Sequence, residues 1–238
     1  MSDDPPKTTG QDALATRWSR IERLHGSDAD DVWRWFIDRY YPEIRAMLRR
    51  RLPTRFAPQA EADFWGYLYA SGALQRADRG RRFRPYLAGV VGNFAKSWLR
   101  KHDQGTANDG QLGQIEASAN LANEQVELRA WARHTVQLAL NAMAEHYPIH
   151  ADVIRWFYGL GDAEHPEQAP ASVLEISARI GKKVAAVHQD LTRGRMRLRS
   201  FLEQELRDQS GTEADWRAEL QLILAAVDED RPGLIPPR

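Results

Sequence analysis

The spacing of apolar residues is the feature that most limits how this 238-residue chain can fold. Apolar side chains recur at steps of three and four along most of the sequence, which places them on one face of an α-helix. No segment shows the alternation of apolar and polar residues that is typical of a half-buried strand. We therefore expect an all-α fold. The clearest helical run consists of Trp33, Phe36, Ile37, Tyr40, Ile44, Met47 and Leu48.

The first half of the chain is expected to form three main helices. Ser27 and Asp28 are candidate caps before the first run, and Pro42 should kink or split it. A short helix is expected over residues 61–70. Pro85 suits the first position of a third helix. Opposite its apolar stripe, this third helix should expose Gly89, Asn93, Lys96 and Arg100.

A change in composition divides the chain into two helical domains. Residues 103–122 are rich in glycine and asparagine and lack a periodic apolar pattern, so they are predicted to be a polar linker. The expected domains are residues 27–102 and residues 123–207. An N-terminal extension covers residues 1–26, and an acidic, amphipathic C-terminal extension covers residues 208–238.

The second domain has the sequence pattern of a helix-turn-helix. Ser172 and Glu175 form a predicted capping box at the start of a short helix, and Gly181 should end it. A long basic helix is expected from about Lys183. Short helix, glycine turn and basic helix together are typical of this motif. The expected core of the domain includes Val126, Trp131, Val136, Leu140, Met143, Ile149, Val153, Ile154, Phe157, Val184, Val187, Leu191, Leu198 and Leu202.

The C-terminal extension is predicted to contain one further helix, over residues 213–227. Its apolar stripe needs a partner, and packing on the second domain is the interpretation we favour, over docking across the domains or binding a regulator. Residues 231–238 are expected to be frayed.

Charge is segregated although the net formal charge is zero. Residues 81–101 contain several basic side chains and no acid, and residues 182–199 contain several against the single acid Asp190. Two basic segments in a neutral chain are typical of two phosphate-facing surfaces. Solvated helix faces would give the same pattern, and charge alone does not separate the two interpretations.

Several functional classes lack their signatures. The chain has no cysteine, which excludes disulfides and a thiol nucleophile and fits a reducing compartment. No apolar run approaches the roughly 20 residues of a membrane span, and the N-terminus lacks the apolar core of a signal peptide. Neither metal-ligand histidine spacing nor a phosphate-loop motif is present. We expect a cytoplasmic protein that is not an enzyme and uses no metal or cofactor.

Two segments resemble the conserved domains of extracytoplasmic function (ECF) sigma factors. Residues 79–94, RGRRFRPYLAGVVGNF, resemble the centre of the first conserved domain of that family. Residues 175–181, EISARIG, begin a second stretch that is similar to the second conserved domain. The resemblance extends over about residues 31–205. The second stretch continues with Val187, Leu191, Arg193-Gly194-Arg195 and Leu198-Arg199.

The resemblance implies a function in transcription initiation. Members of the family bind core RNA polymerase and direct it to promoter DNA, and they do so without a cofactor. The first domain opens and reads the −10 element, and the second reads the −35 element. The candidate regulators are an anti-sigma protein, a Ser/Thr kinase and the C-terminal extension, and the sequence does not decide between them. We expect the free protein to be a monomer.

Carried onto this chain, the resemblance assigns DNA contacts to both basic segments. The loop at residues 77–83 would hold a flipped base, and Tyr86 is equally compatible with base stacking and core packing. The predicted −10 contacts are Arg79, Arg81, Arg82, Phe83, Arg84, Asn93, Lys96 and Arg100. The predicted −35 contacts are Lys182, Lys183, His188, Gln189 and Arg193. Contacts to DNA backbone, polymerase or solvent are expected for Arg195, Arg197 and Arg199.

The segment that corresponds to the family's polymerase-binding helix departs from the usual pattern. Glu61, Asp63 and Tyr67 are the predicted polymerase contacts, but Gly66 should weaken this helix by ~1 kcal/mol relative to alanine. Thr54, just before the segment, is a candidate phosphosite that would add nearly two negative charges. An exposed, unmodified loop threonine is the plainer interpretation.

Two other functions fit parts of the pattern. One is a helix-turn-helix DNA-binding regulator whose N-terminal half serves for dimerisation or sensing. The other is an interaction protein that binds polymerase or sequesters a sigma factor without touching DNA. Exposure of Asn93, Lys96 and Arg100 would favour the sigma factor over the first alternative, because a dimerisation domain has no use for that face.

Overall fold

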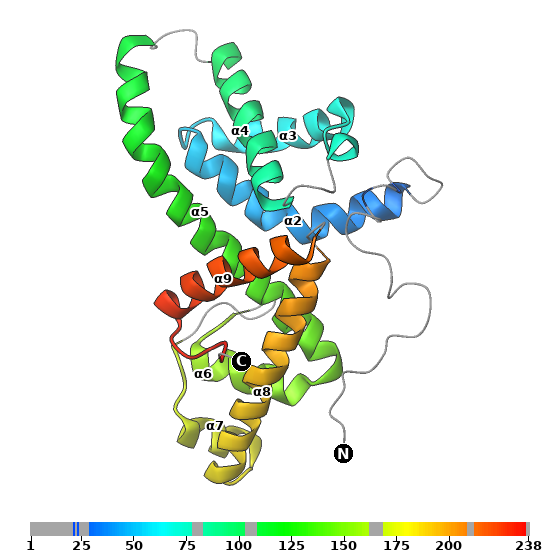
Figure 1. The fold of residues 1–238 in the computed structure, drawn as a ribbon, viewed down its shortest axis with the longest axis vertical. Coiled ribbons are helices and arrows are strands. Elements are labelled where there is room, and N and C mark those ends of the chain that lie inside the picture. The colour runs from blue at the N-terminus through cyan, green and yellow to red at the C-terminus, as the bar shows by residue number, and fades with distance from the viewer. Residues whose placement is uncertain are drawn as a thin grey trace. The chain divides into compact units, whose positions relative to one another are not determined.

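In the computed structural model the described residues are helical and contain no strand (Figure 1). This confirms the all-α prediction. No helix in the described part of the chain is long and apolar enough to span a bilayer. For residues 109–124 the structure describes the backbone only. The described residues are Ile21, Arg23, 29–77, 83–102, 109–161, 169–208 and 212–236.

The chain forms two compact units. Unit 1 comprises Met1–Leu112 together with Arg207–Thr212, and unit 2 comprises Gly113–Leu206 together with Glu213–Arg238. The division at residue 112 falls within the range predicted as a linker.

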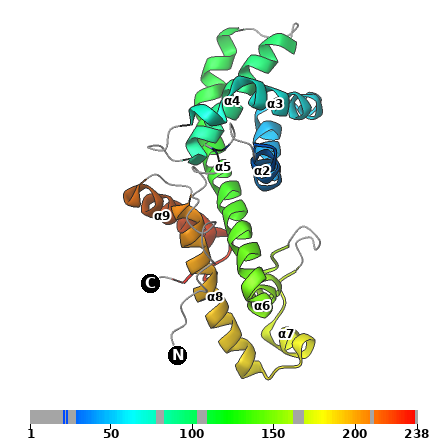
Figure 2. The same ribbon diagram turned by 90° about the vertical axis from the view of Figure 1, so that its right-hand side faces the viewer.

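Unit 1 is built on helices α2, α3 and α4 (Figures 1 and 2). α2 spans Ala29–Arg51, α3 spans Ala57–Ser71 and α4 spans Phe83–His102, and a single 3-10 turn, η3, spans Leu74–Arg76. Pro42 lies inside α2 and does not split it, so that alternative of the prediction was wrong.

The helix boundaries in unit 1 follow local signals only in part. α3 begins four residues earlier than predicted, with Pro58 in its first turn, and ends at Gly72, whose φ of 59° is readily adopted only by a residue without a side chain. Pro85 lies within the first turn of α4, at its third position. The candidate caps Ser27 and Asp28 lie outside the described residues.

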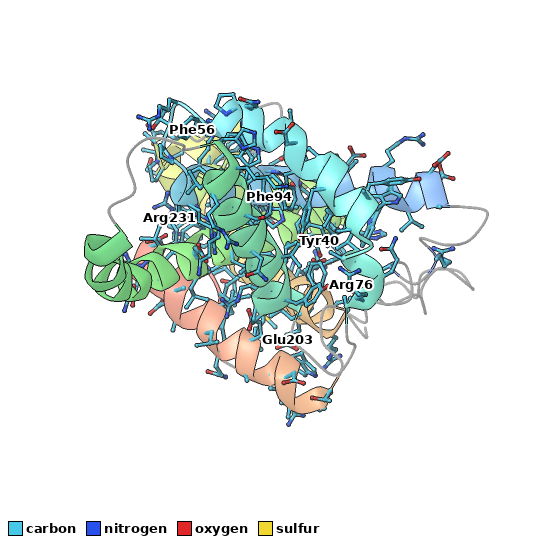
Figure 3. All side chains as sticks on the ribbon, turned by 90° about the horizontal axis from the view of Figure 1, so that it is seen from above. Tyr40, Phe56, Arg76, Phe94, Glu203 and Arg231 are labelled. Carbon is cyan, nitrogen blue, oxygen red and sulfur yellow. The ribbon has the colours of Figure 1, made fainter. Side chains whose placement is uncertain are left out.

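The core of unit 1 is dominated by aromatic rings. The ring centroids of Phe36 and Tyr40 on α2 lie 6.4 Å and 5.2 Å from that of Phe83 at the start of α4. Phe64 on α3 meets Phe94 on α4 at 5.2 Å. Edge and tilted contacts of this kind are favourable ring geometries. Tyr40 and Phe94 from this cluster are labelled in Figure 3.

Unit 2 contains most of α5, which spans Asp109–His146, and the later helices. The predicted linker was wrong over residues 109–122, because these residues continue α5 as helix. Alanine, leucine and glutamine are frequent there, and their helix propensity does not require a periodic apolar face. The other helices are α6 (Pro148–Tyr158), α7 (Val173–Ile180), α8 (Val184–Arg207) and α9 (Glu213–Asp230).

The core of unit 2 confirms most of the predicted stripe. Buried members of that stripe are Trp131, Val136, Leu140, Met143, Val153, Ile154, Val187, Leu191, Leu198 and Leu202. Three predicted core residues are exposed instead: Val126, Ile149 and Val184. Ile149 and Val184 lie in the first turn of their helices.

The C-terminal extension packs on unit 2, as predicted. Trp216, Leu220 and Ile223 of α9 are buried, and Glu229 accepts a hydrogen bond from Arg129 of α5 at 2.7 Å. The residues after α9 were predicted to be frayed, and for residues 231–236 this was wrong. Leu234 is 1% exposed, and the Tyr158 hydroxyl donates to the carbonyl of Gly233 at 2.7 Å.

Candidate nucleic-acid interface

In unit 1, α4 presents a polar face to solvent. Its residues Leu87, Val91 and Phe94 are buried against α2 and α3, so the opposite side of the helix must face outward. This exposed side, the α4 face, consists of Gly89, Asn93, Lys96 and Arg100. It offers one amide and two cations and was predicted from the helical spacing.

Three of the predicted −10 contacts, Arg79, Arg81 and Arg82 in the loop that precedes α4, lie outside the described residues. Arg84 is described and half-buried. Phe83 was predicted to stand beside a flipped base, and this was wrong. It is 2% exposed and fills the aromatic core between α2 and α4.

Tyr86, for which base stacking and core packing were both open, is half-buried in the first turn of α4. Its hydroxyl donates to the carbonyl of Ala73, before η3. Burial raises the pKa of Tyr86, an effect that the nearby Arg76 opposes. The side chain therefore ties α4 to the segment between α3 and the loop.

The three predicted polymerase contacts have different environments on α3. Glu61 is held by two arginines of α2, with Arg49 Nε at 2.6 Å and Arg45 Nε at 3.2 Å, and its side chain is 12% exposed. Asp63 is exposed and accepts a hydrogen bond from Trp98 Nε1 at 2.9 Å. Tyr67 is 37% exposed. Glu61 therefore joins α2 to α3, and a polymerase contact by these residues stays a prediction.

The candidate phosphosite Thr54 is exposed in the turn between α2 and α3. The turn is closed by the backbone N–H of Phe56, which donates to the carbonyl of Pro53 at 2.9 Å. Arg55 beside it lies over the ring of Phe56. Gly66 lies mid-helix in α3, and a Cβ added there would meet open space.

In unit 2, α7, a turn over residues 181–183 and α8 follow one another as in a helix-turn-helix (Figure 1). Ser172 Oγ accepts from the backbone N–H of Glu175, and the backbone N–H of Ser172 donates to the Glu175 carboxylate, so the predicted capping box is confirmed. Hydrogen bonds from Ser172 lower the pKa of Glu175. Gly181 ends α7 with φ at 65°, also as predicted.

The start of α8 carries an exposed polar face. Four of the five predicted −35 contacts lie on it and are exposed; we call Lys183, His188, Gln189 and Arg193 the α8 face. The fifth, Lys182, is half-buried, and its Nζ lies 2.7 Å from the carboxylate of Asp190. The α8 face therefore combines cations with an amide and an imidazole, groups that can donate to phosphates and to base edges.

The three arginines farther along α8 point to partners inside unit 2, contrary to prediction. Arg195 Nε donates to the Tyr158 hydroxyl at 2.8 Å. Arg197 contacts His150 and lies 3.8 Å over the ring of Tyr147. Arg199 pairs with Glu203 at 3.0 Å and donates to the carbonyl of Pro236 (Glu203 is labelled in Figure 3). These arginines brace unit 2.

Sequence reasoning missed the role of Asp190. It is 7% exposed on the inner face of α8, where it meets Lys182 and His150. A signal was present, because Asp190 lies three residues after Val187 and four before Gly194, on the face that α8 buries. An acid on such a face requires partners.

Neither unit offers a metal site in its described residues, where no group of His, Asp and Glu side chains has the required arrangement. Comparison of the chain with models of protein families, with curated protein sequences and with solved structures gives no match.

Proposed function

We propose that this chain is a sigma factor of the ECF type, which binds core RNA polymerase and directs it to promoter DNA. One observation carries the proposal: each of the two units exposes a polar, cationic face on a helix whose other side is buried. In unit 1 this is the α4 face and in unit 2 the α8 face. Both coincide with the segments that resemble the DNA-reading parts of the family.

Each face suits a different form of DNA. The α8 face lies at the N-terminal end of a long helix, the part that a helix-turn-helix inserts into the major groove. Gln189 can pair with adenine and Arg193 with guanine through two hydrogen bonds each. In the proposal, unit 2 reads the duplex −35 element in this way.

The α4 face suits the −10 element. Asn93 offers an amide for base edges, and Lys96 and Arg100 can follow the phosphates of the backbone beside the opened strand. Since Phe83 is buried, stacking on a flipped base falls to a side chain other than Phe83. No covalent chemistry is involved: polymerase makes RNA, and this protein supplies sequence choice and strand capture.

The proposal is tested by mixing the purified chain with bacterial core RNA polymerase. We expect the two to co-elute in gel filtration and to initiate specific transcription from a promoter upstream of the chain's own gene. Absence of co-elution together with tight binding of duplex DNA would contradict the proposal and support the helix-turn-helix regulator. If the chain binds polymerase but has no affinity for DNA, whether free or in the complex with polymerase, the result would support the alternative of an interaction protein that does not touch DNA.

Variants of the two faces separate their roles in the same assay. Asn93→Ala should weaken open-complex formation more than closed-complex binding. Permanganate reactivity of the melted strand measures open-complex formation. Arg193→Ala should weaken binding of a −35 duplex by ~1–3 kcal/mol. The matched controls, exposed on α9, are Gln221→Ala and Arg217→Ala. Equal losses for Asn93→Ala in both steps, or unchanged duplex affinity for Arg193→Ala, would remove that residue from its assigned role.

A further inference from the structure

A buried carboxylate lies directly behind the α8 face. Asp190 belongs to the inward side of α8 and is 7% exposed, while its sequence neighbours His188 and Gln189 are exposed. A carboxylate in such a position is strongly disfavoured unless charged or hydrogen-bonding partners surround it. Its partners therefore decide how this part of unit 2 is held.

Asp190 draws its partners from two other segments of unit 2. The ammonium of Lys182, in the turn before α8, lies 2.7 Å from Asp190 Oδ2. Nε2 of His150, on α6, lies 3.5 Å from Asp190 Oδ1. The carboxylate thus joins the turn and α6 to α8, and of the two contacts the one with Lys182 is the closer.

The imidazole of His150 reaches Asp190 as a neutral donor. Arg197 donates to Nδ1 of His150, so Nδ1 accepts and the hydrogen of the ring lies on Nε2, which faces Asp190. Burial and the charge of Arg197 lower the pKa of His150, which favours this neutral form. Since a neutral imidazole brings no charge, Lys182 supplies the positive charge next to the carboxylate.

This arrangement affects the surface that unit 2 offers to DNA. Lys182 and Lys183 are adjacent at the start of α8, and both were predicted to meet phosphates. Lys183 is exposed, but the side chain of Lys182 is 38% exposed and bound to Asp190. A phosphate that approached Lys182 would meet a cation whose charge the carboxylate of Asp190 already neutralises.

We propose that Asp190 is a positioning residue that holds Lys182 on the helix-turn-helix and withholds its charge from DNA phosphates. Lys183 is then the one of the two lysines that neutralises a phosphate. This inference rests on the proposed function in one respect only, that unit 2 binds duplex DNA.

The salt dependence of DNA binding tests the proposal, because it counts phosphates neutralised. Each neutralised phosphate contributes about −0.9 to the slope of log K against log salt concentration. The full-length chain is titrated with a fluorescently labelled duplex of mixed sequence at salt concentrations between about 50 and 200 mM. A change that only loosens the fold lowers affinity without moving this slope by a whole phosphate.

Four variants make the test specific. We expect Lys182→Met to leave the slope unchanged and Lys183→Met to make it shallower by about 0.9. Asp190→Asn, which frees Lys182, should steepen the slope by about 0.9. Adding Lys182→Met to Asp190→Asn should restore the slope of the unmodified protein. If Lys182→Met makes the slope as shallow as Lys183→Met does, the proposal is wrong, and this comparison holds even where Asp190→Asn fails to fold.

A second measurement needs no DNA. Amine acetylation of the full-length chain, followed by mass spectrometry, compares the labelling rates of Lys182 and Lys183. We expect Lys182 to react several-fold more slowly, and equal rates would overturn the proposal. If Lys182 is protected but no duplex binds to the free chain or to its complex with core polymerase, then the proposed function is wrong while the hold of Asp190 on Lys182 stands.

Discussion

The two units both carry a helix rich in basic residues, but they use those residues differently. In α4 the cations of the α4 face lie opposite the apolar stripe and are exposed, and the core of the unit is dominated by aromatic rings. In α8 the exposed cations of the α8 face lie in the first turns. Farther along, Arg195, Arg197 and Arg199 bind partners within unit 2.

The difference teaches that the number of basic residues in a segment does not measure its nucleic-acid surface. An arginine side chain can lie over an aromatic ring while its guanidinium nitrogens donate hydrogen bonds to hydroxyls, carbonyls or carboxylates. Unit 2 uses arginine in this way, with Arg197 over Tyr147 and Arg195 over Phe157. In unit 1 the contacts between helices are made chiefly by aromatic rings instead.

The largest effect that would sharpen this comparison is expected in the aromatic core of unit 1. Phe83→Ala removes a ring that is 2% exposed and should destabilise unit 1 by ~3–5 kcal/mol. Urea unfolding followed by tryptophan fluorescence measures the change, and Phe83→Leu, which keeps most of the volume, should cost less. Unchanged stability with weaker binding of single-stranded DNA would return Phe83 to the DNA-contacting role.

Substitution of two glycines by alanine compares a tightly packed helix position in unit 2 with an open helix position in unit 1. A Cβ at Gly194 on α8 would lie 3.0 Å from Ile154 Cγ1 and 3.3 Å from the carbonyl oxygen of His150. Gly194→Ala should therefore destabilise unit 2 by ~1–3 kcal/mol. Gly66→Ala on α3 meets open space and should stabilise unit 1 by ~1 kcal/mol. Hydrogen exchange resolved by helix measures both, and a stabilising Gly194→Ala would show that α6 and α8 are not in close contact.

The capping box at the start of α7 should contribute a smaller amount. Ser172→Ala removes the oxygen that accepts from the backbone N–H of Glu175 and should cost unit 2 ~1 kcal/mol. The control Ser200→Ala, on the exposed side of α8, is expected to change stability by less than ~0.5 kcal/mol. Urea midpoints of the two variants give the comparison. Equal midpoints would mean that packing alone fixes the start of α7.

The smallest expected effect is a pH dependence of the stability of unit 2. The groups that face His150 are Asp190, Arg197, Lys182 and Tyr147, and the pKa of His150 is lowered, chiefly by burial. The unfolded chain binds a proton at this position as the pH falls below about 6.5, whereas the folded protein keeps His150 neutral to a lower pH, so acidification in this range favours the unfolded state. The unfolding free energy of unit 2 should decline on acidification from about pH 7 to pH 5.

His150→Gln provides the test of that dependence, because glutamine does not titrate. The variant should show a flatter stability profile over the same pH interval, whatever its stability at neutral pH. A profile with the same slope as that of the unmodified protein would assign the pH dependence to other groups.

Prediction from the sequence succeeded where the signal is local. The capping box at Ser172, the end of α7 at Gly181 and the exposed side of α4 all follow from spacing and backbone preference, and the structure confirms them. It failed over residues 109–122, where helix propensity outweighs the missing apolar period. It also failed for residues 231–236, whose order depends on Tyr158 and a buried Leu234.

Among the residues of the candidate site, too, local patterns were predicted correctly and contacts between distant residues were not. Helical spacing alone placed Asn93, Lys96 and Arg100 on one exposed side, since a helix with a buried stripe must expose the opposite residues. Spacing could not show that Phe83 points inward or that Glu61 is held by two arginines of α2. Those facts depend on side chains that lie far apart in the sequence.

The sequence by itself therefore determined the helical class, the position of the turn between α7 and α8, and the two segments where cations gather. Each of these depends on interactions within a few residues. Only the tertiary structure decided which cations of the second basic segment are exposed and which brace the fold. The physical reason is that a charge leaves water only where a partner is in place, and that partner lies on a different element, α8 for Lys182 in the turn and α6 for Arg197.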